Sequence, residues 1–478
     1  MKALKTDSRL VRNDLIYLLT LAFAFCVVGI GLGSLASWDE AYYAVVSRTM
    51  QLSGDWIHLN YYGAVHHDKP PLYFWLTSIF YSVGGVSEFT SRLTSALSGV
   101  GTVIVTYFIG RALFNRIVGW AGAGILLSST DYLHYARWAT LDITNLFFFS
   151  LAMLYFIKTR QNQKHWIIFW IASGLAFMTK GPIIFLVWGM VTLCLIKRKT
   201  FFATITNRYF ITGFVIFLAI VLPWHIASFL SDPEGFWSGY VYKQYIARTS
   251  SAVEGHTGNY YYYIRTMINK YHPWIFLVPI ALPWIIWQTI RSNTKFVYGI
   301  LLFWILTVFC FFTFGVKTKL QWYILPLHPA ISLCIGVTIY EWFKGRPEWV
   351  LKCIIPIILI AHIPFSSVMV QEYAKEIKAI APEVKQFVQP DERVFLYIYH
   401  EEPAGIYYFD RKVQYIDTHQ DLEGFYKKYP SIAIIIHTHN YDSNKKYLKA
   451  KGFNIITRVG EGKNELLLIS NKDPLIEN

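Results

Sequence analysis

The chain is poor in charged residues and in cysteine. Only 15% of its 478 residues are charged and 54% are hydrophobic, whereas soluble domains carry about 25% charged residues. This shortage excludes an ordinary soluble protein. The five cysteines all lie inside apolar segments, and none is paired at metal-ligand spacing. Their placement excludes a disulfide framework and a zinc–thiolate cluster.

Acidic residues are outnumbered, 30 against 44 basic ones, for a formal net charge of +14. A basic protein could bind nucleic acid, but here the basic residues cluster in short loops between apolar runs. In such loops they set membrane topology and contact the anionic headgroups of membrane lipids. We therefore expect membrane lipids, and no nucleic acid, as partners. The basic loops are 1–12, 111–116, 158–164, 197–208, 291–295 and 344–352.

Apolar runs of about 20 residues, the length that spans a bilayer as a helix, separate these loops. If every basic loop is cytoplasmic, an even number of spans must separate each two successive loops. The apolar segments meet this condition, because two of them lie between each two successive basic loops. The N-terminus is then cytoplasmic, with an uncleaved first span, and the C-terminus lies outside. The eleven predicted spans are 13–36, 89–110, 117–133, 140–157, 165–179, 181–196, 209–230, 272–290, 297–315, 322–343 and 351–370.

From about residue 372 the composition becomes polar, and short β-like runs alternate with helix-like stretches. This pattern predicts a small extracytoplasmic α/β domain at 372–478. Residues 1–371, with a first outer loop at 37–88, are predicted to form the transmembrane domain. The expected fold is an all-α polytopic membrane bundle with about eleven or more transmembrane helices and a small C-terminal α/β domain.

Charged side chains from several separated segments are predicted to meet at the outer membrane face. Lys180 is the most informative, because a lysine between apolar spans is costly unless it serves a site. Two lysines on a non-cytoplasmic turn run against the charge bias and indicate an anionic ligand. The segments are Asp39-Glu40, Asp68-Lys69, Arg137 with Asp142, Lys180 before Gly181-Pro182, the loop 231–271 with Arg248, and Lys317 with Lys319.

Structural roles compete with this interpretation. Asp39 and Glu40 could cap a helix, Lys69 could extend to the lipid interface, and Asp142 favours a helix N-terminus. Taken together, the cations suit a lipid phosphate and a carboxylate suits a general base. There are two competing interpretations of the function. One is a membrane transporter or flippase of a lipid-linked sugar, and the other is a scaffold that recruits a partner.

An ordered set of motifs resembles the C-type (GT-C) glycosyltransferases, closest to the aminoarabinose transferases that modify lipid A and to the protein O-mannosyltransferases. The resemblance covers nearly the whole chain. Its motifs are Asp39-Glu40-Ala41, Ser47-Arg48, Ser53–Trp56, Asp68–Trp75, Glu88-Phe89, Arg92-Leu93, Arg111, Leu113-Phe114, Ala136–Asp142, Thr179–Pro182, Pro283-Trp284, Tyr323–Pro326 and Tyr407–Val413.

The resemblance implies a transferase that takes a sugar from a polyprenyl phosphate, such as undecaprenyl phosphate, in the outer leaflet of a bacterial inner membrane. The acceptor is then lipid A, a protein or another glycan. In this family the residue matching Asp39 is the favoured catalytic carboxylate, and Glu40 stands beside it. The lysine matching Lys69 contacts the lipid phosphate.

Residues matching Arg137, Asp142 and Lys180 line the cavity of that family, and we add Arg248, Lys317 and Lys319 as substrate-binding candidates. Some members bind a divalent metal ion, which makes Asp68 a candidate ligand and His67 a second one. The chain departs from the aminoarabinose transferases at Tyr42, where they usually carry Arg, at Asp68, where they carry Glu, and at His328, which replaces an apolar residue. These changes bear on the sugar and acceptor more than on the reaction type.

Overall fold

The computed structural model describes residues 2–292, 295–343, 348–361, 369–397, 402–429 and 431–472. The chain divides into two compact units. The first, called the helical unit, comprises residues 1–31, 50–60 and 64–369. The second, called the mixed unit, comprises residues 32–49, 61–63 and 370–478.

The helical unit consists of α-helices joined by short turns and by π- and 3₁₀-helical segments. Its helices are α1 (Lys2–Cys26), the end of α2 (Tyr42–Ser53), α3 (Leu72–Gly84), α4 (Glu88–Leu113), α5 (Arg116–Leu127), α6 (Thr130–Ala136), α7 (Leu141–Lys158), α8 (His165–Lys180), α9 (Phe185–Lys197), α10 (Phe201–Ile205), α11 (Arg208–Ser231), α12 (Pro233–Gly235), α13 (Arg248–Ser250), α14 (Tyr262–Lys270), α15 (Val278–Arg291), α16 (Lys295–Cys310), α17 (His328–Trp342) and α18 (Glu348–Ala361). The π-helices η3 (Phe236–Ala247) and η6 (Phe311–Gly315) and the 3₁₀-helix η7 (Gln321–Leu327) lie between them.

Within the described residues, six helices are long and apolar enough to cross a membrane. They are Glu88–Leu113, Leu141–Lys158, Arg208–Ser231, Trp274–Arg291, Phe296–Gly315 and Gln321–Trp342. Each coincides with a predicted span. The other predicted spans fall on α1, α5, α8, α9 and α18, which are shorter or more polar, and the last span also runs into residues outside the described ranges. The chain is thus a polytopic helical protein, and the count of eleven stays a prediction.

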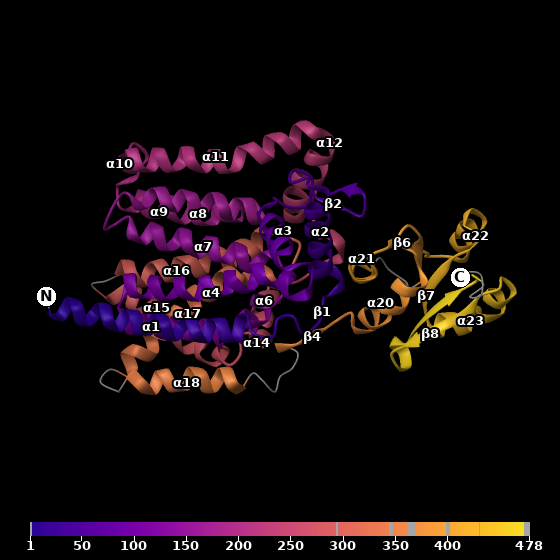
Figure 1. Cartoon of the computed structure of the whole chain (residues 1–478). Coiled ribbons are helices and arrows are strands. Elements are labelled where there is room, and N and C mark those ends of the chain that lie inside the picture. The colour runs from indigo at the N-terminus through magenta and orange to yellow at the C-terminus, as the bar shows by residue number, and fades with distance from the viewer. Residues whose placement is uncertain are drawn as a thin grey trace. The chain divides into compact units, whose positions relative to one another are not determined.

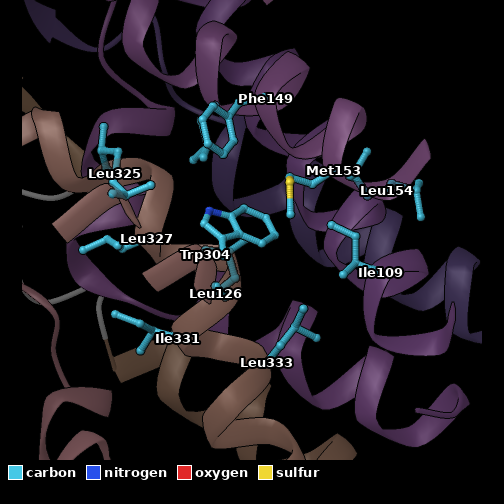
Figure 2. Packing of buried hydrophobic residues seen from close by; sticks show 14 of the residues in the cluster. Ile109, Leu126, Phe149, Met153, Leu154, Trp304, Leu325, Leu327, Ile331 and Leu333 are labelled. Atoms are coloured by element: carbon cyan, nitrogen blue, oxygen red, sulfur yellow. The ribbon is translucent and has the colours of Figure 1, made fainter. Parts of the chain in front are cut away.

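Long helices of this unit lie alongside one another. Helix α8 packs between α7 and α11, while α4 packs on α5 and α7 (Figure 1). A buried apolar core runs between the helices. In Figure 2 the indole of Trp304 on α16 lies against Phe149 and Met153 of α7, with Leu126 of α5 nearby. The ring centroids of Trp304 and Phe149 are 5.9 Å apart.

The mixed unit contains a five-stranded sheet. Its elements are β1 (Gly33–Ser34), η1 (Ser37–Ala41), the start of α2, β4 (Gln371–Glu372), α20 (Lys375–Phe387), β5 (Arg393–Tyr397), α21 (Pro403–Phe409), β6 (Lys412–Tyr415), α22 (His419–Lys428), β7 (Ala433–His437), α23 (Thr438–Ala450), β8 (Asn454–Val459) and β9 (Leu466–Ser470). Two short strands, β2 (Asn60–Tyr61) and β3 (Ala64–Val65), pair with each other.

The order of the large sheet is β6-β5-β7-β9-β8. Strands β5, β6 and β7 are parallel, with Val394 opposite both Val413 and Ala433. Strand β9 is antiparallel to β7 and β8. The central strand β7 is an almost continuous apolar run, Ala433-Ile434-Ile435-Ile436, and it is buried. Such a run is typical of a strand that is covered on both faces.

The start of the first outer loop belongs to this mixed unit, although the sequence predicted it as part of the transmembrane domain. Strand β1 pairs in parallel with β4. The backbone N–H of Leu35 donates to the hydroxyl of Tyr408 at 2.8 Å, and Arg48 donates to the carbonyls of Ile406 and Tyr407, each at 3.0 Å. These hydrogen bonds between residues more than 350 positions apart connect residues 32–49 to α21.

Glycines allow helices α4 and α5 to approach backbone to backbone. A Cβ on Gly119 would lie 2.4 Å from the carbonyl oxygen of Tyr107, and a Cβ on Gly110 would lie 2.6 Å from the Cα of Gly119. Small residues at helix contacts serve this close approach in membrane proteins. By contrast, a Cβ on Gly189 in α9 would meet no atom within 4 Å.

We expect Gly119→Ala to lower the free energy of unfolding by about 1–3 kcal/mol, because the added methyl group must separate two packed helices. Gly189→Ala is the matched control and should be neutral or slightly stabilising, because alanine has a higher helix propensity than glycine. Thermal unfolding of the purified proteins in detergent measures both. Equal midpoints for the two variants would contradict the close α4–α5 contact.

Candidate active site

Lys69 lies at the end of an irregular loop, directly before Pro70, Pro71 and helix α3. A proline has no N–H and a fixed φ, so the pair keeps the chain out of a helix until α3 begins. The Nζ atom of Lys69 donates to Oε1 of Gln244 at 2.5 Å. Nε2 of the same glutamine donates to Oδ1 of Asp68 at 3.1 Å. The buried side-chain amide of Gln244, in the π-helix η3, therefore forms hydrogen bonds with both Lys69 and Asp68.

Lys180 and Asp142 form an ion pair between two adjacent helices of the helical unit. Asp142 lies in the first turn of α7, where a carboxylate is favoured by the helix dipole, and Lys180 is the last residue of α8. Both side chains are about nine-tenths buried. The Lys180 ammonium also lies 5.2 Å from the centroid of the Tyr323 ring. The pair thus places two buried charges beside an aromatic face.

Gly181 continues the chain after Lys180 with φ at +75°, a conformation that favours glycine. A Cβ at this position would lie 2.0 Å from the hydroxyl oxygen of Tyr245. Glycine is therefore required both by the backbone conformation and by the tyrosine of η3 that occupies the space. The contact brings η3 next to the residue that follows Lys180.

Arg248 follows η3 directly, and its guanidinium donates to Glu254 at 3.0 Å. Glu254 also pairs with Lys243 at 3.4 Å. Burial alone would raise the pKa of Glu254, but the charges of Arg248 and Lys243 outweigh it and hold that pKa below its usual range. Arg248 is therefore a cation that is already paired with a carboxylate.

These groups share one electrostatic environment around Lys69. The pKa of Lys69 is lowered from its ordinary value to about 8. Burial is the main cause; Asp68 and Asp142 raise this pKa, and the positive charges of Arg248 and Lys180 lower it. Charges act on a pKa in this way only at short range. We call Asp68, Lys69, Asp142, Lys180, Gln244 and Arg248 the Lys69 cluster.

Burial and nearby charges also act on the pKa of Asp68, where the charges outweigh burial. Burial would raise the pKa of its carboxyl group, but the nearby His66, 3.9 Å away, and the charges of Lys69 and Lys243 lower that pKa well below its usual range. Asp68 is therefore a carboxylate at neutral pH. The cluster as a whole collects acids and bases from four segments that are far apart in the sequence.

Three other predicted substrate-binding residues, Lys317, Lys319 and Arg137, are not part of the Lys69 cluster. The Lys319 ammonium donates to the carbonyls of Phe312, Thr313 and Val316 at 2.5–2.8 Å. A lysine has three N–H donors, so these bonds give Lys319 the role of capping the end of η6. Lys317 is exposed, and its backbone N–H donates to the carbonyl of Arg248 at 3.2 Å.

Arg137 likewise directs its guanidinium to backbone carbonyls. It donates to Phe25 and Val28 near the end of α1 at 2.7 and 2.9 Å, and to Met369 at 2.7 Å. These contacts give Arg137 a structural role, because they satisfy carbonyls that lack helical partners at the end of α1. Substrate binding by Arg137 and by the two lysines on the 316–321 turn stays a prediction.

His67 and Asp68 point to different partners. Nε2 of His67 contacts Asp232 at 3.0 Å, and Nδ1 contacts the hydroxyl of Ser228 at 3.4 Å. Asp68 faces Gln244 and His66. Within the described residues, no group of three or more His, Cys, Asp or Glu side chains is arranged to hold a metal ion. His67 and Asp68 therefore do not fit a divalent ion, and we assign no step to one.

In the mixed unit, Asp39 has an unusual backbone conformation, with φ at +59° and ψ at −78°. Few non-glycine residues adopt such angles, which cost about 1–3 kcal/mol and cluster at functional sites. The neighbouring Glu40 is fully buried, and its carboxylate accepts the N–H of Ala36 at 2.9 Å. Glu40 thus supports the turn in which Asp39 lies, while its own catalytic role stays a prediction.

The sequence did not point to Gln244, Tyr245 or Asp232. All three lie in or near η3, within the long loop where the sequence singled out Arg248, His256 and the tyrosines at 260–263. Gln244 is uncharged and belongs to no recognised motif, so the sequence gives no reason to select it. A π-helix, which is frequent at functional sites, also leaves no clear hydrophobic period.

Comparison with known proteins gives consistent results. A family model described as dolichyl-phosphate-mannose-protein mannosyltransferase matches residues 68–226, the segment that contains Asp68, Lys69, Asp142 and Lys180. An undecaprenyl phosphate-alpha-4-amino-4-deoxy-L-arabinose arabinosyl transferase of Pseudomonas fluorescens is 29% identical over 312 residues, which make up 63% of this chain and 55% of the relative. The chain spans about half the length of the curated relatives it matches.

Solved structures share the fold. The crystal structure of ArnT from Cupriavidus metallidurans bound to undecaprenyl phosphate superposes with a TM-score of 0.74 at 18% identity, covering 97% of this chain and 99% of that one. An oligosaccharyltransferase of Archaeoglobus fulgidus has a TM-score of 0.59 at 11% identity, covering 89% and 69%. The chain is therefore similar in sequence to aminoarabinose transferases and, over residues 68–226, to protein mannosyltransferases, and it shares the fold of ArnT.

Proposed function

We propose that the chain is a glycosyltransferase of a bacterial inner membrane that moves one sugar from a polyprenyl phosphate, such as undecaprenyl phosphate, to an acceptor outside the cytoplasm. The acceptor is lipid A, a protein or another glycan. The observation that carries this proposal is the Lys69 cluster, which gathers three cations in a partly buried site of an apolar helix bundle. The similarity to transferases that use undecaprenyl phosphate supports the choice of donor.

In the proposed reaction an acceptor oxygen or nitrogen attacks the anomeric carbon of the donor sugar. The bond between that carbon and the phosphate oxygen breaks, and the electron pair leaves with the polyprenyl phosphate. Negative charge grows on the phosphate during this step, and Lys69, Lys180 and Arg248 stabilise it. The acceptor gives its proton to Asp39, which acts as the general base.

The proposed topology follows the charges of the loops. The N-terminus is cytoplasmic, and the mixed unit, which carries Asp39, lies outside the cytoplasm. An outer-face location gives Asp39 access to acceptors such as lipid A or exported proteins. It also gives the Lys69 cluster access to a lipid phosphate in the outer leaflet.

Mass spectrometry of glycoconjugates from a strain that lacks the gene tests the proposal. We expect lipid or protein species that carry one additional sugar to disappear and to return with the wild-type gene. Purified protein in liposomes should release undecaprenyl phosphate only when acceptor is present. Movement of the lipid-linked sugar across the bilayer without such release would indicate a flippase instead.

Asp39→Asn should reduce transfer by about 10²-fold or more, because an amide cannot accept the proton of the acceptor. Asparagine tolerates a positive φ, so membrane expression should be unchanged. Asp410→Asn is the matched control: Asp410 also has a positive φ, at +53°, in the same unit, but its exposed carboxylate pairs with Arg48. Restoration of the sugar-modified species in the deletion strain measures both variants, and near wild-type transfer by Asp39→Asn would exclude it as the base.

Binding of undecaprenyl phosphate should weaken as pH rises through about 8. The lowered pKa of Lys69, about 8, means that its ammonium loses its proton there, whereas the phosphate is already ionised above its second pKa of about 6. In Lys69→Arg the guanidinium stays charged, and the decline near pH 8 should vanish. Titration of intrinsic fluorescence with the lipid at pH 6.5 to 9 tests this, and an identical decline in both proteins would contradict the role of Lys69.

A further inference from the structure

The three cations of the Lys69 cluster are not held in the same way. Lys180 is paired with Asp142, and Arg248 is paired with Glu254. Lys69 makes no ion pair within the described parts of the chain, and its ammonium is held by the amide oxygen of Gln244. Lys69 is therefore the cation whose charge is not matched by a carboxylate in direct contact.

The orientation of the Gln244 amide follows from its neighbours. An ammonium group only donates and a carboxylate only accepts, so the amide oxygen must face Lys69 and the amide nitrogen must face Asp68. The two distances, 2.5 Å and 3.1 Å, fit this arrangement. Gln244 is also buried, with 7% of its surface exposed, so water does not easily replace it.

A glutamate would fit the same space and would bind Lys69 more strongly, since a charge-assisted hydrogen bond is about twice as strong as a neutral one. It would also neutralise the ammonium. The glutamine instead satisfies Lys69 with a neutral acceptor and occupies Asp68 with a donor. The arrangement fixes the lysine without cancelling its charge.

We propose that Gln244 is a positioning residue that holds Lys69 and Asp68 apart with a neutral amide and so keeps the Lys69 ammonium available to the phosphate of a polyprenyl phosphate. This inference rests on the proposed function, because it assigns the ligand of that same site. The inference also makes Gln244 a residue that determines selectivity for a lipid phosphate over an uncharged lipid headgroup.

The test compares binding of undecaprenyl phosphate with binding of undecaprenol, the same lipid without the phosphate. We expect wild-type protein to prefer the phosphate. Gln244→Glu should weaken binding of the phosphate lipid by about tenfold to a hundredfold, because a second anion then competes for Lys69. Its binding of undecaprenol should be unchanged, whereas a purely structural defect would weaken both lipids alike.

Gln244→Met separates charge from hydrogen bonding, since it keeps the volume and adds no charge. We expect its loss of phosphate-lipid binding to be clearly smaller than that of Gln244→Glu. Equal losses in the two variants would overturn the proposal. Gln161→Glu, which adds one negative charge at an exposed turn, should bind both lipids as the wild type does.

A glutamate at position 244 would also face Asp68, so the single variant could fail to fold. The double variant Asp68→Asn/Gln244→Glu restores a donor opposite the new carboxylate, and it should still bind the phosphate lipid weakly. Recovery of wild-type binding in the double variant would overturn the proposal. If wild-type protein shows no preference for undecaprenyl phosphate over undecaprenol, the proposed function fails instead, and the two failures are thereby distinguished.

Discussion

A charge inside an apolar helix bundle must have a partner, and the buried ion pairs of the helical unit follow from this constraint. The cost of removing an ion from water is several kcal/mol, which only a counter-ion or several hydrogen bonds can offset. Asp142 and Lys180 satisfy it by pairing with each other. Asp14 on α1 is almost fully buried and satisfies it with two cations, Arg116 of α5 at 2.6 Å and Lys352 of α18 at 3.0 Å.

Against this rule the Lys69 environment is an exception with a functional meaning. Its ammonium donates a hydrogen bond to a neutral amide oxygen and forms no salt bridge among the described residues, and burial is the main cause that lowers its pKa to about 8. Such a group gains more from an incoming anion than a lysine that is already neutralised. The ammonium of Lys319, by contrast, donates to three backbone carbonyls.

The first outer loop is divided between the two units. Residues 32–49 pair with β4 and α21 in the mixed unit, whereas Lys69 belongs to the helical unit. Within the mixed unit, Ser37 accepts the N–H of Ala404 at 3.3 Å, next to the turn that carries Asp39. The motif around Tyr407 that resembles the family therefore has a structural role, since it supports the segment on which the proposed base lies.

The sequence alone determined the polytopic helical character, the positions of the long apolar helices, and the segments that contribute Lys69, Asp142 and Lys180, because hydropathy and isolated charges are local properties. Tertiary structure decided how each cation is used. Whether an ammonium or guanidinium group meets a carboxylate, as in Lys180, a neutral amide, as in Lys69, or backbone carbonyls, as in Arg137, depends on groups that lie up to hundreds of residues away. For the same reason Gln244 and the strained turn at Asp39 could be recognised only when the folded chain brought their neighbours into contact.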